Sequence, residues 1–245
     1  MNRRPARTPE KGEEVQGRLE DKYVFVEGAR DVILAWLEHA CIPGPVYGLE
    51  TVHTVYFDTP NLTLYGEKRN GDYLKSKVRL RWYEEEPAGR PVPDARCFLE
   101  VKLKEGAVCR KRRVELALPE GGLRGRPLLD AAIGDLPARV SELGYSPRGV
   151  LTPVLLVRYR RHRFLDPLSG SRLAVDTDIH AADVNRDLMA AAVPLHLGTG
   201  VLEIKGMHDG APRCLEPIRA HLTKSAFSKY AQCVELATHP VQRRI

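Results

Sequence analysis

Basic residues alternate with apolar residues along several strand-like segments, and this alternation constrains the fold more than any other feature of the chain. In KVRLRWY at 77–83, Lys77, Arg79 and Arg81 share one face of an extended strand, and the apolar residues between them share the other. Such a strand has to bury its apolar face against a second layer. Its cationic face then points either to solvent or into an enclosed space.

The same division recurs in segments far apart in the chain. They are FLEVKLK at 98–104, CRKRRVEL at 109–116, VRYRRHRF at 157–164, RLAVDTD at 172–178 and VLEIK at 201–205. A half-exposed antiparallel sheet with solvated outer rows would give this pattern strand by strand. The chain also carries helices that need a sheet face to cover, which favours basic rows converging inside a closed sheet. In VRYRRHRF both rows are basic, so its inward face stays ambiguous.

The order of elements predicts an α+β fold on an antiparallel sheet. Helical periodicity follows the first strand at 29–41, and Asp58 or Thr59 is placed to cap a short helix over 61–69. Turn signals predict hairpins between 96–106 and 107–118, and between 154–166 and 172–182. The segment 119–148 is rich in Gly and Pro and predicts two small helices, and two further helices end the chain.

Composition fits a single folded domain of 245 residues with a disordered tail at 1–17 and a catalytic domain at 18–245. The net charge of +6 suits an anionic partner. The five cysteines show no metal-site spacing, and the sequence has neither a signal peptide nor an apolar run long enough to span a bilayer. We therefore expect a cytoplasmic protein without a membrane span.

An interior crowded with Arg and Lys needs an anion with many oxygens, and phosphates meet that need. The sparse carboxylates on the same strands could hold a divalent cation that bridges phosphate oxygens. Each is equally well explained as a salt-bridge partner. These carboxylates are Glu20, Glu100, Asp176, Asp178 and Glu203.

Taken in order, the motifs resemble the VTC-type polyphosphate polymerase domain of the triphosphate tunnel metalloenzyme (CYTH-like) superfamily, from about Arg18 to Leu236. The motifs that carry the resemblance are DKY at 21–23, TVYFDT at 54–59, LTLY at 62–65, KVRLRWY, FLEVKLK, KRR at 111–113, YRR at 159–161, RLAVDTD, VLEIK and FSKY at 227–230.

The resemblance implies a closed antiparallel β-barrel, or tunnel, of about eight strands with flanking helices. It implies transfer of the γ-phosphate of ATP to a growing polyphosphate chain with Mn²⁺ or Mg²⁺. The implied phosphate-binding residues are Lys22, Arg79, Arg81, Lys102, Lys111, Arg161, Arg172 and Lys229. Further substrate contacts would come from Tyr159, Arg113, Lys205 and Ser228. Glu203 would be the principal metal ligand, assisted by Glu20, Glu100 and Asp176.

Two departures from related proteins matter. Hydrolases and cyclases of the superfamily often open with an E-x-E-x-K strand, whereas Arg18 stands where the first Glu would be. Eukaryotic polymerase assemblies add a regulatory SPX domain and transmembrane helices, and this chain has neither. The alternatives are a triphosphate hydrolase of the same fold and a non-catalytic binder of polyphosphate or nucleic acid. Few aromatic residues are available for base stacking, which makes nucleic acid the weaker partner.

Overall fold

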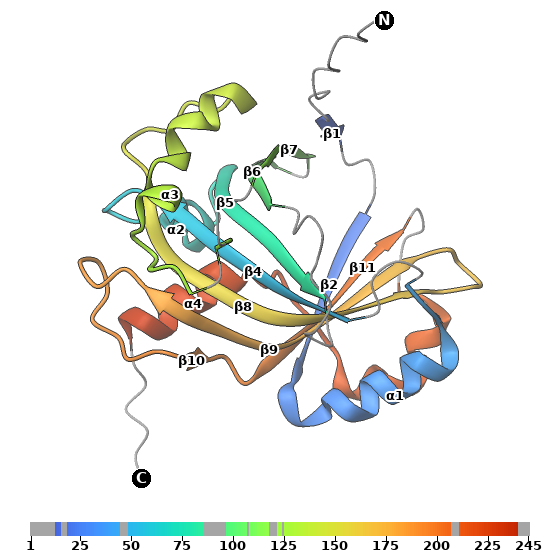
Figure 1. Ribbon diagram of the computed structural model, residues 1–245. Coiled ribbons are helices and arrows are strands. Elements are labelled where there is room, and N and C mark those ends of the chain that lie inside the picture. The colour runs from blue at the N-terminus through green and yellow to red at the C-terminus, as the bar shows by residue number, and fades with distance from the viewer. Residues whose placement is uncertain are drawn as a thin grey trace, which may run out of the picture.

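The computed structural model describes residues 13–15, 19–44, 49–85, 97–106, 108–117, 122–123, 125–206 and 211–239. Its centre is one antiparallel sheet in the order β1-β7-β6-β5-β4-β8-β9-β11-β2-β12, with β3 beside β8 and β10 beside β9 (Figure 1). The strands are β1 (Glu13–Val15), β2 (Leu19–Val26), β3 (Ile42–Pro43), β4 (Leu49–Asp58), β5 (Leu74–Glu85), β6 (Cys97–Glu105), β7 (Val108–Leu116), β8 (Thr152–Leu165), β9 (Arg172–Val184), β10 (Leu195–His196), β11 (Thr199–Gly206) and β12 (Thr223–Lys224).

The sheet is strongly curled, but the prediction of a closed barrel of about eight strands is wrong. The sheet has 12 strands, and no described strand pair joins its two ends. The edge of β7 is occupied by β1, and the edge of β2 by β12. Each edge is therefore covered over part of its length, by three residues at β7 and two at β2. Across the opening, Lys102 on β6 and Glu20 on β2 meet as an ion pair at 3.5 Å between Nζ and Oε2.

Apolar rows on the convex face of the curl pack under helices, as the alternation predicts. Val78, Leu80 and Leu99 are fully buried in a cluster with residues of α3 (Ala131–Gly134) and the 3₁₀ helix η2 (Leu136–Leu143). Val175 and Leu202 pack with α1 (Arg30–Ala40) and the 3₁₀ helix η3 (Arg213–His221). A short 3₁₀ turn, η1 (Glu27–Ala29), precedes α1. These two layers hold the charged rows of the same strands on the concave face.

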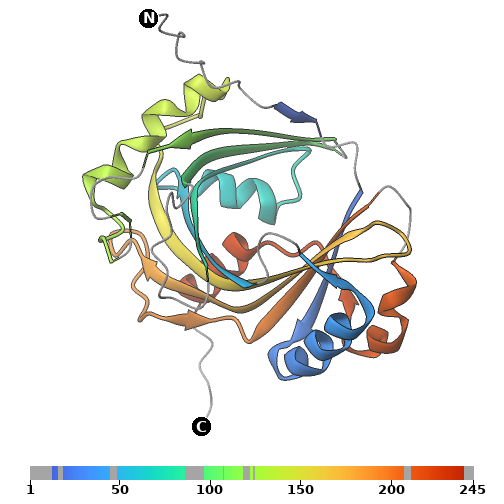
Figure 2. The same cartoon turned by 45° about the vertical axis from the view of Figure 1, so that its right-hand side comes forward.

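Two helices lie within the curve of the sheet, α2 (Thr63–Arg69) and α4 (Lys229–Thr238) (Figure 2). Tyr230 and Val234 of α4 pack with Val52, Tyr56 and Tyr159 of the concave face. One part of the concave face is thus apolar and covered by α4, and the first turn of that helix borders the charged part. Among the described residues no helix is both long and apolar enough to cross a membrane.

Some sequence predictions fall where the structure describes little. Residues 1–12, 16 and 17 of the expected tail lie outside the described residues, and so does Arg18, the expected start of the domain. Glu13–Val15, inside that expected tail, pair with β7. The ambiguity in VRYRRHRF is settled by the fold, because Arg161 and Arg163 reach carboxylates of the concave face.

The predicted cap at Asp58 also ties three elements together. Its carboxylate, fully buried at the end of β4, accepts hydrogen bonds from the backbone N–H groups of Leu64 and Tyr65 at 2.8 Å. It also accepts one from the Tyr230 hydroxyl of α4 at 2.7 Å. Asp58 therefore fixes both interior helices to the end of one strand.

We expect Asp58→Asn to lower the free energy of unfolding by about 2–4 kcal/mol, because an amide leaves at least one buried donor unpaired. Tyr230→Phe removes one donor and should cost about 1 kcal/mol. Urea denaturation of both variants tests this expectation. Equal losses in the two variants would show that Asp58 serves only Tyr230.

Candidate active site

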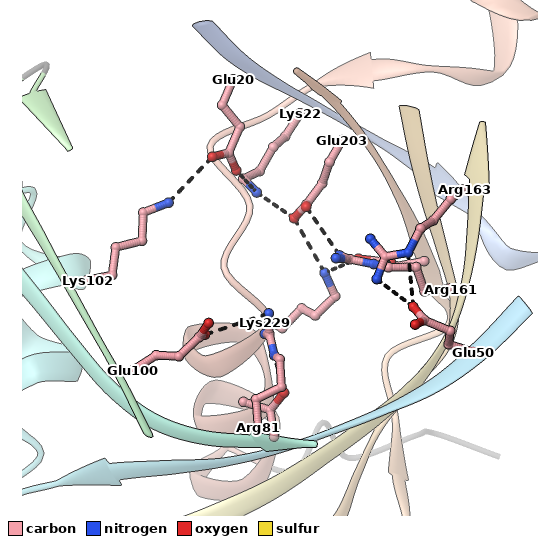
Figure 3. A network of polar contacts seen from close by, with 12 residues as sticks. Glu20, Lys22, Glu50, Arg81, Glu100, Lys102, Arg161, Arg163, Glu203 and Lys229 are labelled. Atoms are coloured by element: carbon pink, nitrogen blue, oxygen red, sulfur yellow. Dashed lines mark hydrogen bonds and ion pairs between the residues drawn. The ribbon is translucent and has the colours of Figure 1, made fainter. Parts of the chain in front are cut away.

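Basic side chains gather on the concave face of the sheet, and we call this set the basic interior. It consists of Lys22, Lys77, Arg79, Arg81, Lys102, Lys111, Arg161, Arg163, Lys205 and Lys229. Fewer carboxylates lie among them, namely Glu20, Glu50, Glu100, Asp176 and Glu203. Figure 3 shows members from β2, β4, β5, β6, β8, β11 and the start of α4 pointing toward one another. These side chains lie together because each contributing strand turns its apolar row toward the convex face and its charged row toward the concave face.

Glu203 on β11 lies beside three cations. It accepts hydrogen bonds from Lys22 Nζ at 2.6 Å and Arg161 Nη2 at 3.2 Å, and Lys229 Nζ lies 3.7 Å away. Burial acts to raise the pKa of Glu203, but Lys22 and Lys229 hold it well below its ordinary value. The carboxylate is therefore charged at neutral pH.

Asp176 on β9 is fully buried and doubly paired. Arg161 donates to both of its oxygens, at 2.6 and 2.7 Å, and Lys229 Nζ donates at 2.5 Å. Burial would raise the pKa of Asp176, but Arg161 and Lys229 lower it. The Tyr159 ring lies beside both cations, with Lys229 Nζ 4.7 Å from its centroid. Tyr159 thus supports the cations through its ring face.

Glu100 on β6 organises the other side of the interior. Arg79 donates to it at 2.6 Å, and Lys111 is also paired with it. Burial would raise the pKa of Glu100, but Arg79 and Arg81 hold it well below its ordinary value. Burial lowers the pKa of Lys111 to about 8, with Arg79 adding to the effect and Glu100 opposing it. One carboxylate therefore serves several cations and leaves positive charge uncompensated.

Lys77 was not among the predicted site residues, although it shares a strand face with Arg79 and Arg81. Its Nζ donates to the Ser228 hydroxyl at 2.9 Å, and no described carboxylate lies within ion-pair distance. Burial, together with Lys102 and Arg79, lowers the pKa of Lys77 to about 7. Ser228 accepts this hydrogen bond and one from the N–H of Ala231, so it also caps α4.

The pair Arg163 and Glu50 was also missed by the sequence analysis. Arg163 donates to the buried Glu50 carboxylate from two nitrogens, at 2.5 and 3.0 Å. The signal for Arg163 was present, since it follows Tyr159 and Arg161 at the same two-residue spacing. Glu50 had none, because it stands alone at the start of a strand of β-branched and aromatic residues.

Three predicted residues lie at the margin of this arrangement. Arg172 is exposed, although its ladder partner Lys205 places it on the concave face. Arg113 is also exposed and stacks over the Phe98 ring at 4.7 Å. Lys205 is half-buried, and burial lowers its pKa. These residues can meet only the outer part of a ligand that occupies the basic interior.

The carboxylates suit a hard divalent cation at one position. Lys22 Nζ lies between Glu20 at 2.5 Å and Glu203 at 2.6 Å, so the protein already holds a cation between two carboxylates there. Burial would raise the pKa of Glu20, but Lys22 and Lys102 lower it to about 2. Mg²⁺ and Mn²⁺ prefer oxygen ligands, and Mg²⁺ often binds through one or two carboxylates plus substrate phosphates. Glu203 and Glu20 keep 12% and 16% of their side chains exposed and fit that requirement, whereas Asp176 and Glu100 are fully buried against their cations.

The solved structures that match this chain share little sequence identity with it. A provisionally assigned adenylate cyclase from Bacillus halodurans is 16% identical with a TM-score of 0.49, covering 81% of this chain and 83% of its own. Another provisionally assigned adenylate cyclase, from Vibrio parahaemolyticus, is 15% identical with a TM-score of 0.47, covering 89% and 99%. No curated protein matches the chain.

The family comparison covers nearly the whole chain. The VTC domain model matches residues 13–238, which includes every strand and helix of the described fold. The matched range also contains the whole basic interior and its carboxylates. The chain therefore belongs to the VTC domain family.

Proposed function

We propose that this protein is an ATP-dependent polyphosphate polymerase that binds its substrates in the basic interior. The observation that carries the proposal is the excess of inward-pointing cations over carboxylates, with Lys77 lacking any described carboxylate partner. Buried uncompensated positive charge is costly, and a chain of phosphates supplies the missing negative charge. Membership in the VTC domain family supports the same substrate class.

The proposed reaction is an in-line phosphoryl transfer. A terminal oxygen of the acceptor phosphate chain attacks the γ-phosphorus of ATP, the bond to the β,γ-bridging oxygen breaks, and ADP leaves with that electron pair. Arg79, Arg81 and Arg161 are suited to hold non-bridging oxygens through paired N–H groups, and the lysines add point charges. The residues position the two chains and stabilise the charge that develops during transfer.

A bound Mn²⁺ or Mg²⁺ would neutralise phosphate charge and lower the barrier to attack at the γ-phosphorus. Glu203 is the proposed principal ligand and Glu20 the second. Lys22, now between them, would turn to a phosphate oxygen. Asp176 and Glu100 are proposed to orient Arg161 and Arg79 instead of binding metal, because both carboxylates are fully buried against those cations.

The first test incubates purified protein with ATP and Mn²⁺ and follows products by gel electrophoresis and phosphorus NMR. We expect long-chain polyphosphate and ADP, and a loss of rate of about a hundredfold or more in Glu203→Gln. Orthophosphate as the sole product would assign a hydrolase. Tight binding of tripolyphosphate without turnover, unchanged by Glu203→Gln, would contradict both enzymatic functions.

A second test uses two lysines on the same face of β6, at different distances from the end of the strand. Lys102 belongs to the basic interior, whereas Lys104 is exposed. Lys102→Met should weaken tripolyphosphate binding by about 10- to 100-fold, the range expected for one charged hydrogen bond. Lys104→Met is the matched control and should bind like the wild type in calorimetry. Equal effects of the two substitutions would mean that the ligand responds to net charge alone.

A third test concerns Lys77. Its folded-state pKa of about 7 lies below the ordinary lysine value, so above pH 7 the unfolded chain binds more protons than the folded one. Stability linked to Lys77 should therefore rise between pH 7 and about 10. Lys77→Met should remove this rise and increase the melting temperature at pH 7 by about 2–6 °C.

The same variant should bind tripolyphosphate about tenfold more weakly at pH 6.5, where wild-type Lys77 is mostly protonated. At pH 8.5 the difference should shrink unless the ligand draws a proton onto Lys77, which calorimetry in two buffers of different ionisation enthalpy would detect. A variant that binds as well as wild type at both values would exclude Lys77 from the substrate site.

A further inference from the structure

Two histidines and an aspartate meet on β9 and its short neighbour β10, the two strands labelled side by side in Figure 1. His180 on β9 lies directly opposite His196 on β10 in the antiparallel ladder. On its other side His180 pairs with Arg158 of β8, whose neighbour Tyr159 faces the interior. Because side chains alternate along a strand, His180 points to the opposite side of the sheet.

A β-bulge brings Asp178 to the same side. The register between β8 and β9 shifts so that Asp178 and Ile179 together oppose Tyr159. Asp178 takes a left-handed backbone conformation with φ of 50°. Without the bulge, Asp178 would follow Asp176 onto the concave face. The extra residue turns its carboxylate toward the histidines.

The donor atoms have the spacing of a small tetrahedral metal site. Asp178 Oδ1 lies 3.5 Å from His180 Nδ1 and 3.3 Å from His196 Nδ1, and one donor atom from each residue falls within 4.8 Å of the others. Donors about 2.0–2.1 Å from a tetrahedral Zn²⁺ lie about 3.3–3.4 Å apart. His180 Nδ1 also lies 2.8 Å from the Asp178 carbonyl, a contact that coordination through Nδ1 would replace.

The surroundings suit a metal ion with three protein ligands and a fourth coordination position open to solvent. His196 and Asp178 are 56% and 43% exposed, so a hydrated ion can reach them. Glu27 accepts a hydrogen bond from the Asp178 N–H at 3.1 Å, and its other carboxylate oxygen is buried without a hydrogen-bond partner among the described residues. Arg158 beside His180 opposes a cation, which favours exchangeable binding over permanent retention.

We propose that Asp178, His180 and His196 form a site for a borderline transition-metal ion, with Zn²⁺ as the best match. Two imidazoles and one carboxylate suit Zn²⁺, whereas Mg²⁺ and Mn²⁺ prefer ligand sets made mainly of oxygens. The site is separate from the basic interior and does not depend on the proposed polymerase activity. A bound ion would link β10 to the bulge of β9, the strand that carries Asp176.

The test titrates Zn²⁺ into chelator-treated full-length protein without nucleotide, by calorimetry, and repeats the titration with Co²⁺ to read its visible absorption. We expect one site with the intense bands of tetrahedral Co²⁺. His196→Ala should weaken binding by more than about tenfold. Asp178→Asn should do the same, and Asn tolerates the left-handed backbone, so the bulge should be retained.

Two control variants separate this site from other sources of affinity. His39→Ala removes an exposed histidine at the end of α1 and should leave Zn²⁺ binding unchanged. Glu203→Gln alters the basic interior and should also leave it unchanged. Loss of binding in Glu203→Gln with retention in His196→Ala would locate the ion in the interior and overturn the proposal. Octahedral Co²⁺ spectra, or no binding above a His39→Ala, His196→Ala double variant, would overturn it as well.

Discussion

The structure depends on holding more positive than negative charge in a partly buried space. Three carboxylates compensate most of this positive charge, because each pairs with at least two cations. They are Glu100, Asp176 and Glu203. Such pairs contribute little net stability once desolvation is counted. The stabilising free energy comes from the apolar rows on the other face of the same strands, which pack under helices on the convex side. Burial outside the sheet thus compensates for the charge held inside it.

Much of the fold was predictable from the sequence, because period-2 alternation and turn residues act locally. The hairpins β6–β7 and β8–β9 and the Asp58 cap are examples. Closure of the sheet was not predictable. It depends on whether distant edges pair, and here β1 and β12 occupy those edges. The 3₁₀ geometry of η3, with Pro217 inside it, was also missed, since helical periodicity does not distinguish α from 3₁₀ turns over so short a stretch.

The candidate site shows the same division between local and distant signals. Alternation identified Arg79 and Arg81, whereas Arg161 came only from the family resemblance. Neither could show that Arg172 ends up exposed at the margin. Lys77 was visible in the strand pattern, yet its lowered pKa depends on the other cations that the fold brings near it. Glu50 could be found only through its partner Arg163. Pairing across more than a hundred residues leaves no mark in local sequence.

The opening between the β7 end and the β2 end of the sheet has a consequence for the proposed handling of a polymer. In the described part of the chain the two sides meet through the side chains of Lys102 and Glu20, not through a backbone ladder. These two side chains can change rotamer without breaking a strand pair, so the two ends of the sheet can move apart at this ion pair. A long polyanion held inside such a channel could slip out sideways along its length. A fully hydrogen-bonded barrel would release the same molecule only by threading it end first.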